Sequence, residues 1–165
     1  MVTFNPKFTE VVHLDLEGYV PKQDRIQKRS SMYANPGNPS HFLLGGVLCR
    51  EFPLQSAKPT LTPIWNFSPE QEEDTLRQIY RYFQESWNLL EGKTWEHPDL
   101  IVMGFGISRF DIPAIFTRSL IKKIDNIENL FETYLKTKIV DLGDVGIHCS
   151  QDVRNQFCIP RLRTR

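Results

Sequence analysis

The sequence contains little cysteine, and its three cysteines suit neither a disulfide framework nor a zinc site. Cys49, Cys149 and Cys158 are odd in number, and no two of them form a C-x-x-C pair. Disulfide-rich domains and cysteine zinc sites both rely on paired cysteines at short, regular spacings. We therefore interpret all three as small apolar side chains within an ordinary folded core.

An excess charge of one sign and a long apolar run are also missing. Twenty Lys or Arg residues balance twenty Asp or Glu residues, so the net charge gives no global field that would attract a polyanion. No stretch approaches the roughly 18 apolar residues of a membrane span, and the opening MVTFNPKFTE is not a secretory signal. We expect a cytoplasmic protein without membrane contact.

The composition that is present is typical of one folded domain. The chain has 165 residues, of which 40% are hydrophobic and 12% aromatic, enough to build a genuine core. The exception is the polar segment 20–40, which is rich in proline and glycine and carries the basic residues Lys22, Arg25, Lys28 and Arg29. This segment is either a basic flap or a solvated insertion.

Apolar periodicity predicts an α/β fold. Short apolar segments bounded by turn residues predict strands at 11–18, 41–51, 63–67, 100–103 and 138–142. The first three strands follow one another without an intervening helix, so we expect them to form a meander. Apolar residues at three- and four-residue steps predict helices at 68–92, 111–120, 127–135 and 148–159.

The first predicted strand carries two carboxylates on one face. In VVHLDLEG, Asp15 and Glu17 are two positions apart, so both side chains point to the same side of the strand. Two like charges in a sheet repel each other, and a cation between them removes that repulsion. The pair is therefore either half of a metal site or a solvated strand end before the turn at Gly18.

Two later segments contain further candidate residues. Asp111 follows a buried strand and precedes an apolar helical pattern, so it lies at a strand-to-helix junction. There it is either the N-cap of the helix or an acid at the sheet edge where α/β proteins bind ligands. Near the C-terminus, His148 and Asp152 are four positions apart and share one helical face.

Three segments in chain order resemble the exonuclease motifs of the DEDD superfamily of 3′-5′ exonucleases. They are DLE at 15–17, GFGISRFDIP at 104–113 and HCSQDV at 148–153. Within the superfamily, the chain is most similar to the predicted exonucleases related to the proofreading domain of family B DNA polymerases. The resemblance implies a single ribonuclease H-like domain over residues 1–165, with a mixed sheet flanked by helices and an antiparallel meander of the first three strands.

The resemblance also assigns roles to individual residues. Asp15 and Glu17 match the D-x-E of the first motif, Asp111 matches the F-D-x-P acid, and Asp152 matches the final acid. These four carboxylates would hold two Mg²⁺ or Mn²⁺ ions. His148 occupies the position of the tyrosine in the Y-x-x-x-D motif and would orient the attacking water.

Besides the histidine in place of the tyrosine, the sequence departs from the family pattern in two further places. Gly106 stands where related proteins usually carry Asn, and we assign Gly106 and Phe110 to substrate binding. For Phe110 the alternative is packing in the core. The domain is also shortened between Leu142 and His148, where related exonucleases carry a longer, mostly helical insertion. For Asp141 and Asp144, which lie near this shortened segment, positions at a strand end and in a turn favour structural roles.

The implied function is hydrolysis at the 3′ end of single-stranded DNA or RNA by a two-metal mechanism. The carboxylates do not distinguish DNA from RNA, because that choice depends on contacts to the 2′ position of the sugar. Two alternatives stay open: a nuclease-like module that binds nucleic acid or a protein without cutting, and an unrelated metal-dependent phosphohydrolase. The oligomeric state is not indicated by any pattern in the sequence.

Overall fold

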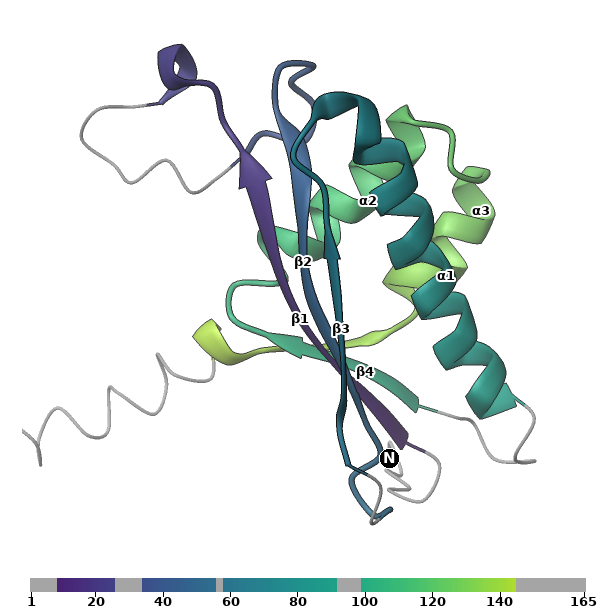
Figure 1. Cartoon of the computed structure of the whole chain (residues 1–165). Coiled ribbons are helices and arrows are strands. Elements are labelled where there is room, and N and C mark those ends of the chain that lie inside the picture. The colour runs from purple at the N-terminus through teal and green to yellow at the C-terminus, as the bar shows by residue number, and fades with distance from the viewer. Residues whose placement is uncertain (1–8, 26–33, 56–57, 92–98, 145–165) are drawn as a thin grey trace, which may run out of the picture.

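The computed structural model describes residues 9–25, 34–55, 58–91 and 99–144 (Figure 1). Its first half contains three strands, β1 (Thr9–Tyr19), β2 (Phe42–Glu51) and β3 (Thr60–Trp65), with a short 3₁₀ turn, η2 (Lys22–Asp24), after β1. The second half contains η3 (Pro69–Gln71), α1 (Glu72–Glu91), β4 (Asp99–Gly104), α2 (Asp111–Ile121), α3 (Ile127–Leu130), the π-helical turn η4 (Phe131–Leu135) and β5 (Lys138–Asp141).

The five described strands form one open mixed sheet with the order β3-β2-β1-β4-β5. β1, β2 and β3 pair antiparallel, which confirms the predicted meander. β4 pairs parallel to β1, and β5 pairs parallel to β4. The prediction of an α/β protein with a mixed sheet flanked by helices is confirmed.

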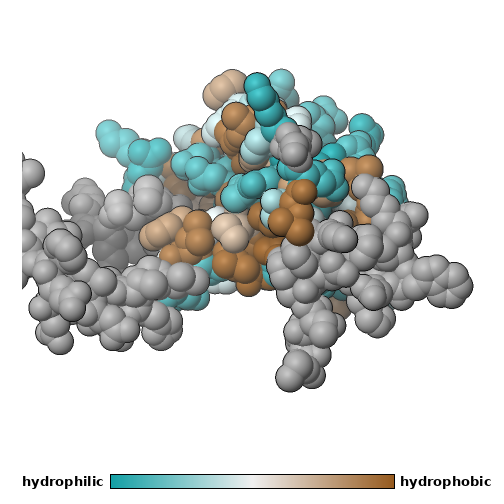
Figure 2. All heavy atoms as spheres, turned by 90° about the horizontal axis from the view of Figure 1, so that it is seen from below, coloured by the Kyte–Doolittle hydropathy of each residue, from teal (hydrophilic) through white to brown (hydrophobic). Residues whose placement is uncertain are grey.

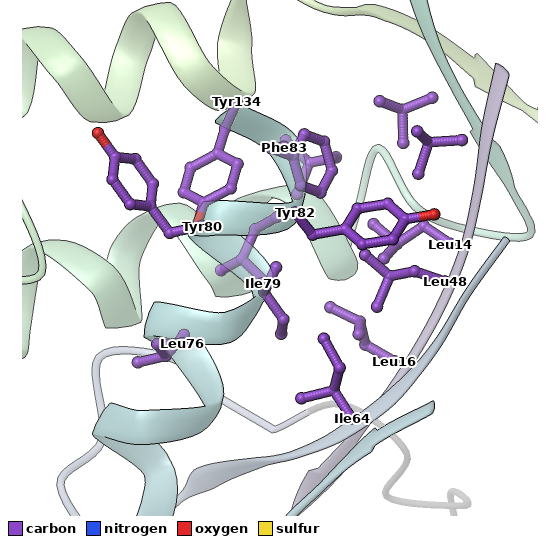
Figure 3. Packing of buried hydrophobic residues seen from close by; sticks show 14 of the residues in the cluster. Leu14, Leu16, Leu48, Ile64, Leu76, Ile79, Tyr80, Tyr82, Phe83 and Tyr134 are labelled. Atoms are coloured by element: carbon purple, nitrogen blue, oxygen red, sulfur yellow. The ribbon is translucent and has the colours of Figure 1, made fainter. Parts of the chain in front are cut away.

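β1 is the central strand, and its alternating side chains divide the sheet into two faces. Its apolar side chains Val12, Leu14 and Leu16 are buried in the main core. In Figure 3 the labelled strand residues Leu14 and Leu16 lie opposite aromatic and aliphatic side chains of α1. The helices α1, α2 and α3 lie together beside this face of the sheet in Figure 1, so the acids of β1 point away from the helices.

The helix α1 packs on the sheet through the predicted apolar stripe. Leu76, Ile79, Phe83 and Leu90 recur at three-, four- and seven-residue steps and are almost completely buried. Burying one such side chain contributes about 1.5–3 kcal/mol of hydrophobic free energy. The stripe therefore belongs to the hydrophobic core, where it packs α1 against the sheet and does not contact a ligand.

A buried ion pair joins α1 to α2. Glu72, at the start of α1, is completely buried and accepts hydrogen bonds from the guanidinium of Arg118 and from the backbone N–H of Leu43 at 2.8 Å. Arg118 also donates to the carbonyl oxygens of Pro36 and Asn38 at 3.2 and 3.3 Å. The described end of the polar segment 20–40 is therefore fixed to the helical layer.

The surface is not uniformly polar. Seen from below in Figure 2, hydrophobic residues gather in the middle of the view, and hydrophilic residues lie above them. Large apolar side chains that are exposed include Leu61, Trp65, Phe67 and Phe105. None of the described helices has the length and apolar character needed to cross a membrane.

Candidate active site

Asp15 and Glu17 lie near the carboxyl end of β1, on the face opposite the helices. Both are exposed, whereas Leu16 between them is only 4% exposed and packs in the core. Beside them the β1–β2 pairing contains a bulge, because Glu17 pairs with Gly45 but Gly18 pairs with Leu43. Bulges increase the local twist of a sheet and are frequent next to active sites.

Asp111 joins these two acids from the other half of the chain. It is the first residue of α2, yet the residue at the N-cap position is Phe110, whose side chain makes no capping hydrogen bond. Instead, Asp111 Oδ1 accepts the backbone N–H of Leu16 at 2.8 Å. The alternative that Asp111 serves as the helix N-cap is therefore wrong, because its carboxylate is committed to the strand.

The environment of Asp111 opposes its negative charge. The residue is only 4% exposed, and this burial raises the pKa of its carboxyl to about 7, against the hydrogen bonds donated by backbone N–H groups. The charges of Asp15 and Glu17 add to the increase in the Asp111 pKa. The three carboxylates thus interact electrostatically, and a cation among them would favour the ionised form of Asp111.

The three acids line one pocket of about 400 Å³. Gly106 and Phe110, the residues predicted to bind substrate, line the same pocket. Five of the seven predicted site residues are therefore brought together. His148 and Asp152 lie outside the described residues, as does the helix predicted at 148–159.

The two predicted substrate-binding residues have different settings. Gly106 has φ +74°, in the left-handed region that glycine and asparagine adopt most readily, and the space around its Cα is open. Phe110 is half-buried, and its ring lies so close to Gly18 that a Cβ there would be 3.1 Å from Cζ. Phe110 therefore also serves as packing between α2 and the end of β1.

Phe105 is a pocket residue that was not predicted from the sequence. This side chain is 79% exposed and lines the pocket directly, just beyond the end of β4. A signal was present, because Phe105 is an aromatic residue between two glycines that follow a buried strand. Because the Phe105 side chain lies at the end of a strand and is not packed in the core, it is available to contact a ligand.

Asp141 has the structural role predicted for it. Its carboxylate accepts the backbone N–H of Gly106, Ser108 and Gly143 at 2.8–3.0 Å and the hydroxyl of Ser108 at 2.5 Å. Burial raises the pKa of this carboxyl, but these hydrogen bonds outweigh the effect and lower it to about 2. Asp141 thereby fixes the loop after β4 that forms one side of the pocket.

Asp144 also borders the pocket, but it is engaged in an ion pair. Its Oδ1 lies 2.7 Å from an Nη of Arg109, and both side chains are largely exposed. Exposed pairs of this kind contribute little to stability, typically less than about 1 kcal/mol. Arg109 is the one cationic side chain among the pocket residues that the structure describes.

The residues fit a divalent metal by their chemistry. Carboxylate oxygens are the ligands that Mg²⁺ and Mn²⁺ prefer, and the buried, proton-retaining Asp111 is the kind of group that a nearby cation would ionise. Among the described residues, however, no three His, Cys, Asp or Glu side chains are positioned to hold an ion as they stand. The predicted fourth ligand, Asp152, lies outside that part of the chain.

Comparisons with models of known protein families and with curated proteins found no match to this chain.

Proposed function

We propose that this protein is a metal-dependent 3′-5′ exonuclease that hydrolyses phosphodiester bonds of single-stranded nucleic acid. The observation that carries the proposal is the hydrogen bond from Leu16, between Asp15 and Glu17, to the buried carboxylate of Asp111, 95 residues later. Placing a third acid beside two others costs free energy, and burial increases that cost. Metal ions bound between the three carboxylates would offset this cost, so the arrangement is explained if the acids bind metal.

The sheet supports the same assignment. The order β3-β2-β1-β4-β5, with three antiparallel strands followed by two parallel ones, is the arrangement expected of a ribonuclease H-like fold. Asp15, Glu17 and Asp111 lie toward the carboxyl ends of β1 and β4, where α/β sheets bind ligands. We infer membership of the DEDD superfamily, in the group related to the proofreading domain of family B DNA polymerases.

Each predicted residue has a part in the proposed reaction. Asp15, Glu17, Asp111 and Asp152 would hold two Mg²⁺ or Mn²⁺ ions, which supply positive charge to the phosphate and lower the pKa of the attacking water. His148 would orient that water as a general base. Gly106 and Phe110 border the space that the terminal nucleotide would occupy.

A second candidate is a nuclease-like module that binds nucleic acid or a protein but does not cut. It is favoured by the finding that no three acidic or imidazole side chains of the described residues stand ready to hold an ion. This module predicts binding of a single strand without metal-dependent loss of the strand. The two candidates therefore differ in one directly measurable product.

The test is incubation of the full chain with a 5′-labelled single strand and Mn²⁺, followed by separation of the products by length. We expect a ladder of successively shorter strands and no ladder in EDTA. Asp15→Ala should abolish the shortening. The matched control is Glu51→Gln, which changes a carboxylate on the same face of the sheet, paired with His13 at 3.1 Å. An intact strand in Mn²⁺, or a ladder that survives Asp15→Ala, would overturn the exonuclease.

A further inference from the structure

The edge strand β3 has an apolar exposed face. Along residues 61–67, Leu61, Trp65 and Phe67 are 68%, 46% and 84% exposed, and Pro63 is exposed too. The alternate positions face the core, where Ile64 is 5% exposed. Strands with one solvated face ordinarily place polar residues on it, so an apolar exposed face indicates a surface that binds something.

The strand register places Trp65 in one row with Glu17. Glu17 pairs with Gly45 on β2, and Gly45 pairs with Trp65 on β3. Residues paired in this way share a face of the sheet, and neighbouring strands are about 4.8 Å apart, so the two Cα atoms are separated by roughly 10 Å. The preceding row, which contains Leu16 and Ile64, faces α1 in Figure 3, so Glu17 and Trp65 both point away from the helices.

The residue between Glu17 and Trp65 is a glycine, so no side chain stands between them in this row. Gly45 has φ +111°, and a Cβ there would lie 1.9 Å from the carbonyl oxygen of Ile64. Every other residue is therefore excluded at this position of the bulge. Gly45 itself is buried, so the carboxylate of Glu17 and the indole of Trp65 are the exposed groups of this row, and none of the described helices lies on this face of the sheet (Figure 1).

One observation restricts what can bind beside this row. An added β-strand would need a continuous row of N–H donors along the edge of β3, and Pro63 interrupts that row. On the opposite side of the pocket, the carboxylate of Asp141 accepts four hydrogen bonds and that of Asp144 is paired with Arg109. A single strand that leaves the pocket over Glu17 would reach Trp65 in the same row of the sheet.

We propose that Trp65 is a base-stacking contact for a single strand whose 3′ end lies in the acidic pocket. The proposal rests on the proposed function for the identity of the ligand and names a contact outside the pocket itself. An exposed indole offers a large π-face to a base of any sequence, and one such contact is typically worth about tenfold or more in affinity. Trp65 would thus hold a nucleotide upstream of the scissile bond.

The experiment measures binding of a 5′-fluorescent oligothymidylate to the full chain with Mg²⁺, in an Asp15→Asn background that prevents cleavage. We expect Trp65→Ala to weaken binding about tenfold or more and Trp65→Phe to retain most of the affinity. Leu61→Ala is the matched control, because it removes an exposed apolar side chain from the same face of the same strand. It should leave the affinity unchanged.

A second measurement separates stacking from a general effect on the fold. An abasic site moved along the oligonucleotide should weaken binding at one upstream position when Trp65 is present and have no further effect in Trp65→Ala. Thymidine monophosphate should bind Trp65→Ala and the parent chain equally. No oligonucleotide binding, equal binding by Trp65→Ala and the parent, or an equal loss in Leu61→Ala would each overturn the stacking role.

The outcomes also distinguish this inference from the proposed function. Trp65-dependent binding by a chain that never shortens a strand would support the stacking role and reject the exonuclease. If the strand is shortened in an Asp15-dependent way but its affinity does not depend on Trp65, the exonuclease is supported and the stacking role is rejected. If Trp65 instead contacts an apolar protein partner, Trp65→Ala should change neither the abasic scan nor the affinity for the oligonucleotide, and the stacking role is rejected.

Discussion

At the scale of single residues, Asp111 is held where its charge is disfavoured. Its carboxylate is buried and hydrogen-bonded to β1 next to two exposed acids. A side chain needed only for that hydrogen bond could be asparagine, which offers the same acceptor without the charge. The presence of an ionisable group at this position is therefore informative about chemistry.

The raised pKa of Asp111 gives a prediction for stability in metal-free buffer. Because the pKa is about 7 in the folded chain and 3.8 in the reference state, the folded state binds more protons between these values. The free energy of unfolding should then fall as the pH rises from about 4 to about 7, by an amount on the order of a few kcal/mol. Asp111→Asn should lack this decline and be more stable than the parent at pH 8.

Urea unfolding in EDTA at pH 5 and pH 8 checks this expectation. Asp74→Asn is the control, because it neutralises an exposed acid in the first turn of α1 and should leave the pH slope as in the parent. Parallel pH profiles for Asp111→Asn and the parent chain would show that the carboxyl is not protonated in the fold. The prediction would then fail.

The residues of the site were predictable to different extents. Asp15 and Glu17 followed from a two-residue spacing within one strand, because strand geometry alone puts them on the same face. The bond between Asp111 and Leu16 depends on a contact across 95 residues, which no local pattern contains. Phe105 was missed because an aromatic side chain near a strand end is usually core.

At the scale of elements, the loop after β4 takes its shape from the end of β5. The carboxylate of Asp141 accepts four hydrogen bonds from this loop and from Gly143. Asp141→Asn leaves one carbonyl oxygen as an acceptor, so some of these donors lose their partner. We expect a loss of about 1–3 kcal/mol in the free energy of unfolding at pH 7.

The pH dependence of this loss has a defined sign. Because the pKa of Asp141 is depressed to about 2, its contribution is present above the reference value of 3.8 and disappears as the pH falls from about 4 toward 2. Acid unfolding followed by circular dichroism, with urea unfolding at pH 7, measures both effects. Asp144→Asn, which breaks only an exposed ion pair, should change stability by less than about 1 kcal/mol. Equal losses in the two variants would contradict the anchoring role.

The elements themselves were largely predictable, but their edges were not. Every strand and helix predicted within the described residues is present, because apolar periodicity records burial directly. β3 begins and ends earlier than the predicted 63–67, since its pairing with β2 sets its limits. The bulge at Gly45 could not be located in advance, because either glycine of the pair Gly45–Gly46 would satisfy the sequence pattern.

At the scale of the whole molecule, the site depends on how the sheet and the helices are held together. Periodicity does not give the order of the strands. The meander of the first three strands was expected because no helix separates them, whereas the mixed sheet was expected from the resemblance of the motifs. In the folded chain, the buried pair of Glu72 and Arg118 joins α1 to α2 and to the segment before β2. The same carboxylate accepts the backbone N–H of Leu43, so one pair connects the helical layer to the sheet.

Removing one partner of the Glu72–Arg118 ion pair should destabilise the fold more than removing both partners together. Arg118→Met removes the main partner of a fully buried carboxylate and leaves Lys122, at 3.5 Å, as its one cationic neighbour among the residues that the structure describes. We expect a loss of about 3–5 kcal/mol in the free energy of unfolding. The double variant Glu72→Gln with Arg118→Met should recover part of this loss, because Gln keeps an acceptor for Leu43 and carries no charge.

Urea unfolding of both single variants, the double variant and the parent chain gives the coupling energy of the pair. Arg77→Met is the matched control, since it breaks an ion pair with Glu73 that is half exposed and lies within one helix. Pairs of that kind contribute about 0.3–0.5 kcal/mol. If Arg118→Met costs no more than Arg77→Met, the connection between α1, α2 and the sheet rests on apolar packing alone. Asp111, at the start of α2, would then owe its position beside β1 to the core and not to this pair.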